Sequence, residues 1–191
     1  MPGKQAKTLT DAQALRLLRL ARRRRYPERD RVILLLSFKA GLRAGEIAGL
    51  TWQMVLDARG RIAPVIALHD CAAKCGSGRT IPMHRELRQA LIDLRRVTGA
   101  DGSVVLSERG GSMRASSIVC WFAALYAEAG FDGCSSHSGR RTFITKAARH
   151  VQRAGGSIRD VQALAGHRSI AMTQRYIDAD SSVQRRLVGM L

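Results

Sequence analysis

Apolar residues recur at helical spacing along most of the chain. Leu87, Leu91 and Leu94 share one face of the segment 84–97, and a denser apolar run fills 28–40. Apolar positions three and four residues apart form one side of an α-helix. We therefore expect helices over residues 11–25, 28–40, 44–50, 84–97, 115–129, 138–150 and 161–165, and a last helix that Ser169 caps and that carries Tyr176.

Polar residues and glycines mark where several of these helices begin and end. Thr10 with Gln13 and Ser157 with Asp160 have the spacing of capping boxes, in which each side chain bonds the other residue's backbone N–H. Glycines 41, 99, 130 and 166 follow the expected ends of four helices, where a left-handed residue is common.

A short region between the helices has the pattern of strands. Residues 62–68 and 79–83 are rich in β-branched and apolar residues, and Gly76-Ser77-Gly78 lies before the second run. These features predict a small antiparallel sheet near residues 54–83. The fold class is thus α+β, mainly α-helical, and 191 residues most naturally form one domain.

The charge of the chain indicates a nucleic-acid partner. Thirty-two Lys and Arg against fifteen Asp and Glu give a net charge of +17, spread through the sequence. Basic surfaces bind DNA because neutralised phosphates release counterions. Aromatic residues make up only 5% and do not alternate with the basic ones, which favours duplex over single-stranded nucleic acid. The alternative is a basic protein whose charges are simply solvated.

Other sequence features bear on compartment and cofactors. No apolar run is long enough to span a bilayer and residues 1–7 lack the apolar core of a signal peptide, so we expect a cytoplasmic protein that does not contact membranes. The four cysteines are expected to be reduced, and their spacing does not fit a zinc site. The acidic residues do not cluster as in metal-dependent nucleases, so neither a metal nor another cofactor is expected.

Two local motifs place arginines at helix starts. In Gly41-Leu42-Arg43-Ala44-Gly45-Glu46, Glu46 can orient the guanidinium of Arg43, although an ordinary ion pair would have the same spacing. In His137-Ser138-Gly139-Arg140-Arg141, His137 and Arg140 share one helix face and can contact one phosphate from two sides.

Two further motifs supply a lysine, a histidine and a tyrosine. Lys74 lies beside the glycine-rich turn, from which a lysine can enter a DNA groove and donate a proton. Gly166-His167 precedes Tyr176 by nine residues across a short helix. Arginines stabilise the charge that develops on a phosphodiester during attack, and a tyrosine hydroxyl becomes a nucleophile among positive charges. Such a set can transfer a phosphoryl group without a metal.

The order of these motifs resembles that of the tyrosine recombinase (phage integrase) family, over roughly residues 10–180. The resemblance implies the tyrosine recombinase catalytic-domain fold and site-specific recombination through a 3′-phosphotyrosyl intermediate and a Holliday junction. Tyr176 would be the nucleophile and Lys74 the general acid, and His137 would accept the tyrosine proton or help hold its geometry. Arg43, Arg140 and His167 would bind the phosphate, with Glu46 positioning Arg43.

The resemblance also implies a domain organisation. Residues 1–9 would be a basic N-terminal segment, 10–180 the catalytic domain, and 181–191 a tail that docks in cis or on a neighbouring protomer. The family usually has an N-terminal DNA-clamping domain before the first helix. The sequence is therefore either a piece of a longer protein or a branch of the family that works without that domain.

The expected partners follow from the same resemblance and from the charge. They are double-stranded DNA, a homotetramer on paired DNA sites, and accessory DNA-bending proteins. The expected DNA-binding side chains outside the catalytic set are Arg22, Arg23, Arg79 and Arg141. Two alternatives remain at this point: a type IB topoisomerase, which relaxes DNA, and a non-catalytic DNA-binding regulator.

Overall fold

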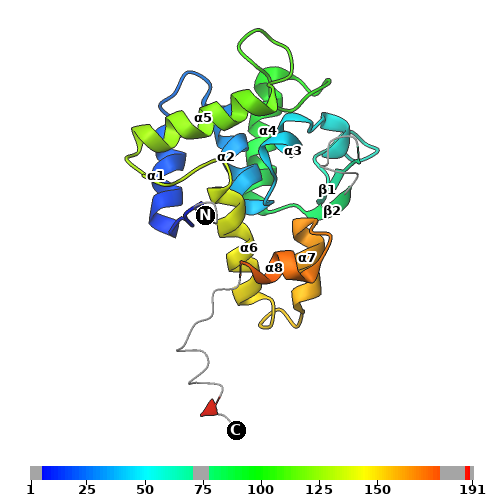
Figure 1. Cartoon of the computed structure of the whole chain (residues 1–191). Coiled ribbons are helices and arrows are strands. Elements are labelled where there is room, and N and C mark those ends of the chain that lie inside the picture. Colours follow the sequence, from blue (N-terminus) through cyan, green and yellow to red (C-terminus); the bar gives the residue numbers. More distant parts are fainter. Residues whose placement is uncertain (1–5, 71–77, 177–187, 190–191) are drawn as a thin grey trace.

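Helix α2 (Pro27–Lys39) lies at the centre of the main hydrophobic core (Figure 1). Residues 32–36 of this helix are all buried, as expected for a helical segment that is apolar on every side. Helices α1 (Asp11–Ala21), α3 (Ala44–Ala48), α4 (Arg85–Thr98) and α6 (Ser138–His150) pack around it. The computed structural model describes residues 6–70, 78–176 and 188–189.

A two-stranded antiparallel sheet lies beside this core. Strands β1 (Val65–Leu68) and β2 (Arg79–Pro82) pair with Leu68 opposite Arg79, and the 3-10 helix η1 (Trp52–Met54) contacts β1. Ile66 and Ile81 face each other and are buried in the core. The Asp70 carboxylate accepts a hydrogen bond of 2.7 Å from the backbone N–H of Gly78. The predicted fold, mainly helical with a small antiparallel sheet, is confirmed.

The C-terminal helices form a second, smaller core. Ile144 of α6 packs there with Val161 and Ala165 of α7 (Ile158–Ala165), and Tyr176 lies against this cluster. Helix α8 (Ile170–Gln174) contacts α7, while α5 (Ala115–Glu128) packs on α3 in the main body. Figure 1 shows α7, α8 and the C-terminal half of α6 together below the rest of the molecule.

Helix α6 connects the two cores, and a glycine lets it approach α2. A Cβ atom on Gly139 would lie 2.1 Å from the Ser37 hydroxyl oxygen and 2.6 Å from the Phe38 ring. Only glycine therefore fits where α6 crosses α2, and the next residue is Arg140. Further along α6, Ile144 reaches the second core. The residues of the candidate site lie where the two cores meet.

The structure differs from the sequence-based expectations at several element ends. Helix α1 ends at Ala21 and not at residue 25, because the arginines that follow form turns and Arg24 pairs with Glu128 of α5 at 2.8 Å. Strand β1 begins at Val65 and not at residue 62. Ser169 is the N-cap of α8 but makes no side-chain capping bond, and Tyr176 lies two residues beyond the end of that helix.

No helix among the described residues is both long and apolar enough to cross a bilayer. The same residues contain no group of three or more His, Cys, Asp or Glu side chains that is arranged to hold a metal ion.

Candidate active site

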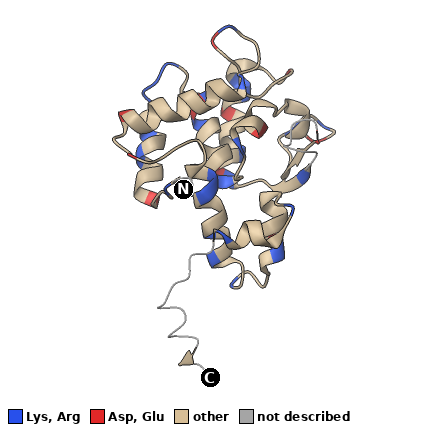
Figure 2. Ribbon diagram, viewed as in Figure 1, with Lys and Arg blue, Asp and Glu red and all other residues tan. Residues whose placement is uncertain are grey.

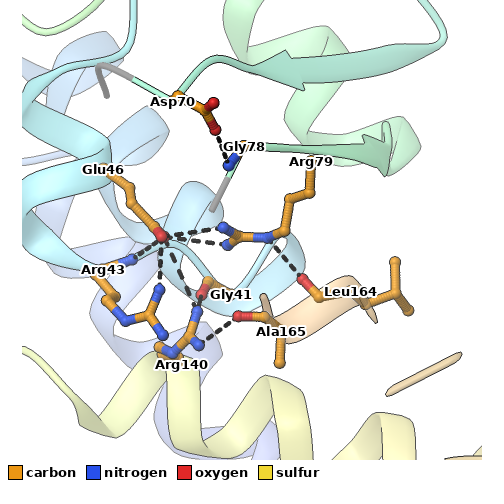
Figure 3. Close-up of polar contacts among 9 residues, drawn as sticks. All are labelled: Gly41, Arg43, Glu46, Asp70, Gly78, Arg79, Arg140, Leu164 and Ala165. Carbon is orange, nitrogen blue, oxygen red and sulfur yellow. Dashed lines mark hydrogen bonds and ion pairs between the residues drawn. The ribbon is translucent and has the colours of Figure 1, made fainter. Parts of the chain in front are cut away.

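Glu46 is the centre of a buried cluster of charged side chains (Figure 3). It is the third residue of α3 and only 1% exposed. Its Oε1 accepts hydrogen bonds from Nη1 of Arg43 at 2.7 Å and Nη1 of Arg79 at 3.0 Å. Its Oε2 accepts from the backbone N–H of Arg43 at 2.9 Å and from Nη2 of Arg79 at 3.1 Å. Both carboxylate oxygens are thus fully engaged by donors.

The surroundings of Glu46 keep it ionised. Burial raises the pKa of the carboxyl group, but the hydrogen bonds and positive charges of Arg79 and Arg43 outweigh burial and hold the pKa below its ordinary value. The carboxylate therefore stays negative at neutral pH. It is shared by several guanidinium groups, so the cluster retains excess positive charge and is suited to bind an anion.

Arg140 is fixed by backbone carbonyls from two different parts of the fold. Its Nη1 donates to the Gly41 carbonyl at 2.6 Å and its Nη2 to the Ala165 carbonyl at 2.5 Å, while Nη1 lies 3.9 Å from Oε2 of Glu46. Burial and the nearby Arg43 and Arg79 charges lower the pKa of Arg140 to about 10, so it remains cationic at pH 7. A guanidinium has more N–H donors than these contacts use.

His167 borders the arginine cluster as a neutral, oriented ring. It follows Gly166, whose φ of 61° ends α7 in the left-handed conformation, and it is 7% exposed. Its Nδ1 lies 2.9 Å from the hydroxyl oxygen of the buried Thr173. Burial, together with the charges of Arg140, Arg43 and Arg79, lowers the pKa of His167 to about 4. The imidazole is therefore uncharged at neutral pH.

Tyr176 lies next to His167 and is held by its backbone. The two rings stack with their centroids 5.4 Å apart and their planes at 25°. The Tyr176 N–H donates to the Thr173 carbonyl at 3.0 Å, and the Thr145 hydroxyl of α6 donates to the Tyr176 carbonyl at 3.3 Å. The side chain is half-buried, and a charge on Tyr176 would act on Arg140. The phenol thus has an anchored position beside the cationic cluster.

The structure brings together most of the catalytic residues that the sequence predicts. Arg43 and Arg140 pair with Glu46, and the charges of these arginines act on the neighbouring His167, which stacks on Tyr176. His137 is exposed at the N-cap of α6, and the described contacts do not link its ring to Tyr176. Lys74 lies outside the described residues. The catalytic roles of all these residues remain predictions, and for His137 and Lys74 the described contacts add no placement at the site.

Arg79 occupies a different place from the one expected for a DNA-binding side chain. Its side chain is only 7% exposed, and besides Glu46 it contacts the Leu164 carbonyl of α7, to which Nε donates at 3.0 Å. This contact could not be predicted from the sequence because Arg79 and Glu46 lie 33 residues apart. Thr173 was not predicted as the partner of His167 either, although the spacing of six residues across a short helix was a usable signal.

The other expected DNA-binding arginines lie apart from this cluster. Arg141 is half-buried, and its Nη1 donates to the Ala6 carbonyl at 3.1 Å. Arg22 and Arg23 are exposed in the turn after α1. Figure 1 shows the segment between α1 and α2 at the opposite end of the molecule from α7 and α8. Figure 2 shows Lys and Arg positions spread over several helices and loops of the molecule, with fewer Asp and Glu positions among them. DNA contact by these arginines stays a prediction.

A basic hollow of about 470 Å³ opens next to His167. Arg79, Arg159, His167 and Arg168 are among its lining residues, together with Gly166 at the end of α7. The exposed arginines at 159 and 168 extend the positive character of the site beyond the Glu46 cluster.

The chain matches a known protein family. The model of the phage integrase family matches residues 7–182. A tyrosine recombinase XerC of Xanthomonas axonopodis pv. citri is 29% identical over 182 residues, which are 94% of this chain and 56% of that protein. The chain thus spans about half the length of the curated relatives that it matches.

Solved structures share the fold over nearly the whole chain. The XerA recombinase is 25% identical with a TM-score of 0.75, covering 99% of this chain and 66% of its own. The Tn1549 transposon integrase in complex with transposon right-end DNA is 22% identical with a TM-score of 0.75, covering 100% and 67%. A λ integrase tetramer bound to a Holliday junction is 19% identical with a TM-score of 0.69, covering 92% and 49%.

Proposed function

The chain belongs to the phage integrase family, and on this basis we propose that it is the catalytic part of a tyrosine-type site-specific DNA recombinase. It cuts and rejoins DNA strands through a 3′-phosphotyrosyl intermediate. The observation that carries the proposal is the convergence of Arg43 and Arg140 on Glu46 beside the stacked His167 and Tyr176. The names of the relatives, which are recombinases and integrases, support this reading over a topoisomerase or a non-catalytic regulator.

The arginine cluster supplies the phosphate site. Arg43 and Arg140 donate hydrogen bonds to the nonbridging oxygens of the scissile phosphate and stabilise the charge that builds on them during attack. Glu46 holds Arg43 through its 2.7 Å contact and keeps the guanidinium groups at one place. The carbonyls of Gly41 and Ala165 fix Arg140, so this donor needs little rearrangement when DNA binds.

His167 adds a neutral hydrogen-bond donor to the same phosphate. If the Thr173 hydroxyl donates to Nδ1, the proton of the neutral ring resides on Nε2, which can then donate to a nonbridging oxygen. Because the pKa of His167 is lowered to about 4, the ring keeps this neutral form over the physiological range.

Tyr176 and two further residues carry the bond changes. The phenolic oxygen attacks the phosphorus, a phosphotyrosyl bond forms, and the bond to the 5′ oxygen breaks. His137 accepts the tyrosine proton, and Lys74 donates a proton to the leaving 5′ oxygen. Attack by a 5′ hydroxyl on the phosphotyrosyl bond reverses these steps and reseals a strand. The covalent link conserves the phosphodiester energy, so the reaction consumes no nucleotide cofactor.

The partners of the reaction are also proposals. We propose that the chain binds double-stranded DNA, assembles as a homotetramer on paired sites, and exchanges strands through a Holliday junction, with accessory DNA-bending proteins where the site requires them. Residues 10–180 are the catalytic domain, 1–9 a basic N-terminal segment and 181–191 a tail that docks in cis or on a neighbour. Because the proposed substrate is DNA inside a cell, we propose action in the cytoplasm.

Covalent capture of DNA tests the proposal. The protein is incubated in EDTA with nicked duplexes whose central segment is randomised. Because of the nick, cleavage releases a short fragment that is lost, so the covalent complex accumulates. We expect a denaturant-resistant protein–DNA band with wild type and with the matched control Tyr26→Phe, and none with Tyr176→Phe. The absence of any band with wild type, despite tight binding of the same duplexes, would contradict strand cleavage by this chain.

A further inference from the structure

Arg79 makes contacts that a DNA-binding arginine would not need. Its guanidinium bonds both oxygens of Glu46, and its Nε donates to the Leu164 carbonyl (Figure 3). It therefore joins three parts of the fold: strand β2, the start of α3 and the end of α7. A Cβ atom on Gly166 would lie 2.8 Å from its Nη1, so the turn before His167 also packs directly on this side chain.

These contacts place Arg79 between the two halves of the phosphate site. On one side Glu46 holds Arg43, and on the other side the end of α7 supplies the Ala165 carbonyl to Arg140 and carries His167. Strand β2, which begins with Arg79, also packs against α7. Although Arg79 lines the hollow beside His167, its side chain is only 7% exposed, and Nε, Nη1 and Nη2 each donate to a protein acceptor.

We infer that Arg79 is a positioning residue, which acts through Glu46 and the Leu164 carbonyl to set Arg43, Arg140 and His167 at one phosphate. A guanidinium is suited to this role because its planar set of donors binds a carboxylate with two parallel bonds and still reaches a third acceptor. A lysine keeps the charge but cannot bond both oxygens of Glu46 and the carbonyl together.

The expected effect of Arg79 on the cleavage rate rests on the proposed function, whereas its expected effect on the structure of the site does not. Misplacement of catalytic groups by about 1 Å lowers a rate on the order of a hundredfold. We therefore expect Arg79→Gln to slow single-turnover cleavage by about that factor, with Arg79→Lys in between. Arg96→Gln is the matched control, because this substitution removes the same charge from a side chain that is 74% exposed.

The salt dependence of DNA binding separates a positioning role from phosphate contact. Each phosphate contact contributes about 0.9 to the slope of log affinity against log salt concentration. With a nonspecific duplex as the probe, Arg79→Gln should keep the wild-type slope and bind within about threefold of wild type, since a guanidinium that contacts no phosphate displaces no counterion from the DNA. Arg43→Gln should lower the slope by about one. A slope lowered equally by Arg79→Gln would overturn the inference and make Arg79 a DNA-contacting residue.

Amide hydrogen exchange on the DNA-free protein tests the structural step separately. Loss of the bond to Leu164 should speed exchange of the Gly166 and His167 amides about tenfold in Arg79→Gln, while the α4 amides keep their wild-type rates. Uniform acceleration over all elements would show a general stabilising role and would overturn the inference, as would unchanged exchange and cleavage. If wild type captures no DNA, the proposed function fails, and the exchange and salt measurements still decide the role of Arg79.

Discussion

Replacement of Glu46 by glutamine tests the electrostatic design of the site. The substitution keeps the shape of the side chain but turns one acceptor oxygen into an NH₂ group. Whichever oxygen is replaced, two of the four hydrogen bonds from Arg43 and Arg79 are lost, and the new donor faces their N–H groups. The carboxylate charge that offsets the buried guanidinium groups is lost as well.

The magnitude follows from these losses. A hydrogen bond to a charged group contributes about 1.5–3 kcal/mol, and removal of one partner from a buried ion pair costs about 3–5 kcal/mol. Arg43 is 20% exposed and can regain water, which places the expected loss near the lower end, at about 3 kcal/mol. For a chain of this size each kcal/mol lowers Tm by about 2–4 °C, so we expect a decrease of about 6–12 °C.

The pH dependence adds a second, independent signature. The folded-state pKa of Glu46 is below its ordinary value of 4.5, so the unfolded state binds more protons as pH falls through that range. The stability from Glu46 is therefore present above pH 4.5 and is lost as pH falls through the lower folded-state pKa. In Glu46→Gln this contribution is absent, so the difference from wild type should shrink in acid.

Urea unfolding of wild type, Glu46→Gln and the control Glu108→Gln measures both effects. Glu108 pairs with Arg25 at 3.6 Å on the surface, with 63% of its side chain exposed, so its replacement should change the unfolding free energy by less than about 0.5 kcal/mol. The reasoning is refuted if Glu46→Gln is as stable as Glu108→Gln at pH 7, or if its deficit grows as the pH is lowered.

Three further predictions concern His167, Thr173 and Gly139. Thr173→Val keeps the side-chain shape but removes the bond to His167 Nδ1, so single-turnover cleavage should fall by about tenfold while the fold is retained; an unchanged rate would exclude an orienting role for Thr173. Titration of His167 by NMR should give a folded-state pKa of about 4, and a pKa near 6.5 would contradict the burial of the ring. Because the unfolded state then binds more protons between pH 4 and 6.5, the stability that this group contributes should rise with pH over that window. Gly139→Ala, whose Cβ would lie 2.1 Å from the Ser37 oxygen, should lower the unfolding free energy by about 1–3 kcal/mol in urea, and Gly45→Ala, which has open space, should not cause this loss.

The elements of the fold follow largely from local sequence signals. The capping boxes of Thr10 with Gln13 and of Ser157 with Asp160 form as the spacing predicts, and Gly166 ends α7 with a positive φ. The end of α1 did not follow, because the pairing of Arg24 with Glu128 of α5 depends on how two distant helices pack. Element ends are sensitive to such tertiary contacts.

In the candidate site, too, local contacts could be predicted from the sequence and distant contacts could not. The pairing of Arg43 with Glu46 lies within one helical turn, so its spacing was enough to predict it. The Gly41 carbonyl that binds Arg140 lies 99 residues away, and Arg79 reaches Leu164 over 85 residues. Contacts at such separations depend on the packing of α6 and α7 against the main core. The sequence led to the expectation that Arg79 contacts DNA, whereas its burial and its contacts with Glu46 and Leu164 depend on this packing.

Peptide mapping of the covalent complex tests the central claim most directly. The complex captured in EDTA is digested with nuclease and trypsin, and the modified peptide is sequenced by mass spectrometry. Cleavage after Arg175 gives a peptide that begins with Tyr176. The account predicts a nucleotide joined through its 3′-phosphate to the Tyr176 oxygen, with a free 5′ hydroxyl on the released strand. A nucleotide on any other residue, or a 5′-phosphate link, would contradict it.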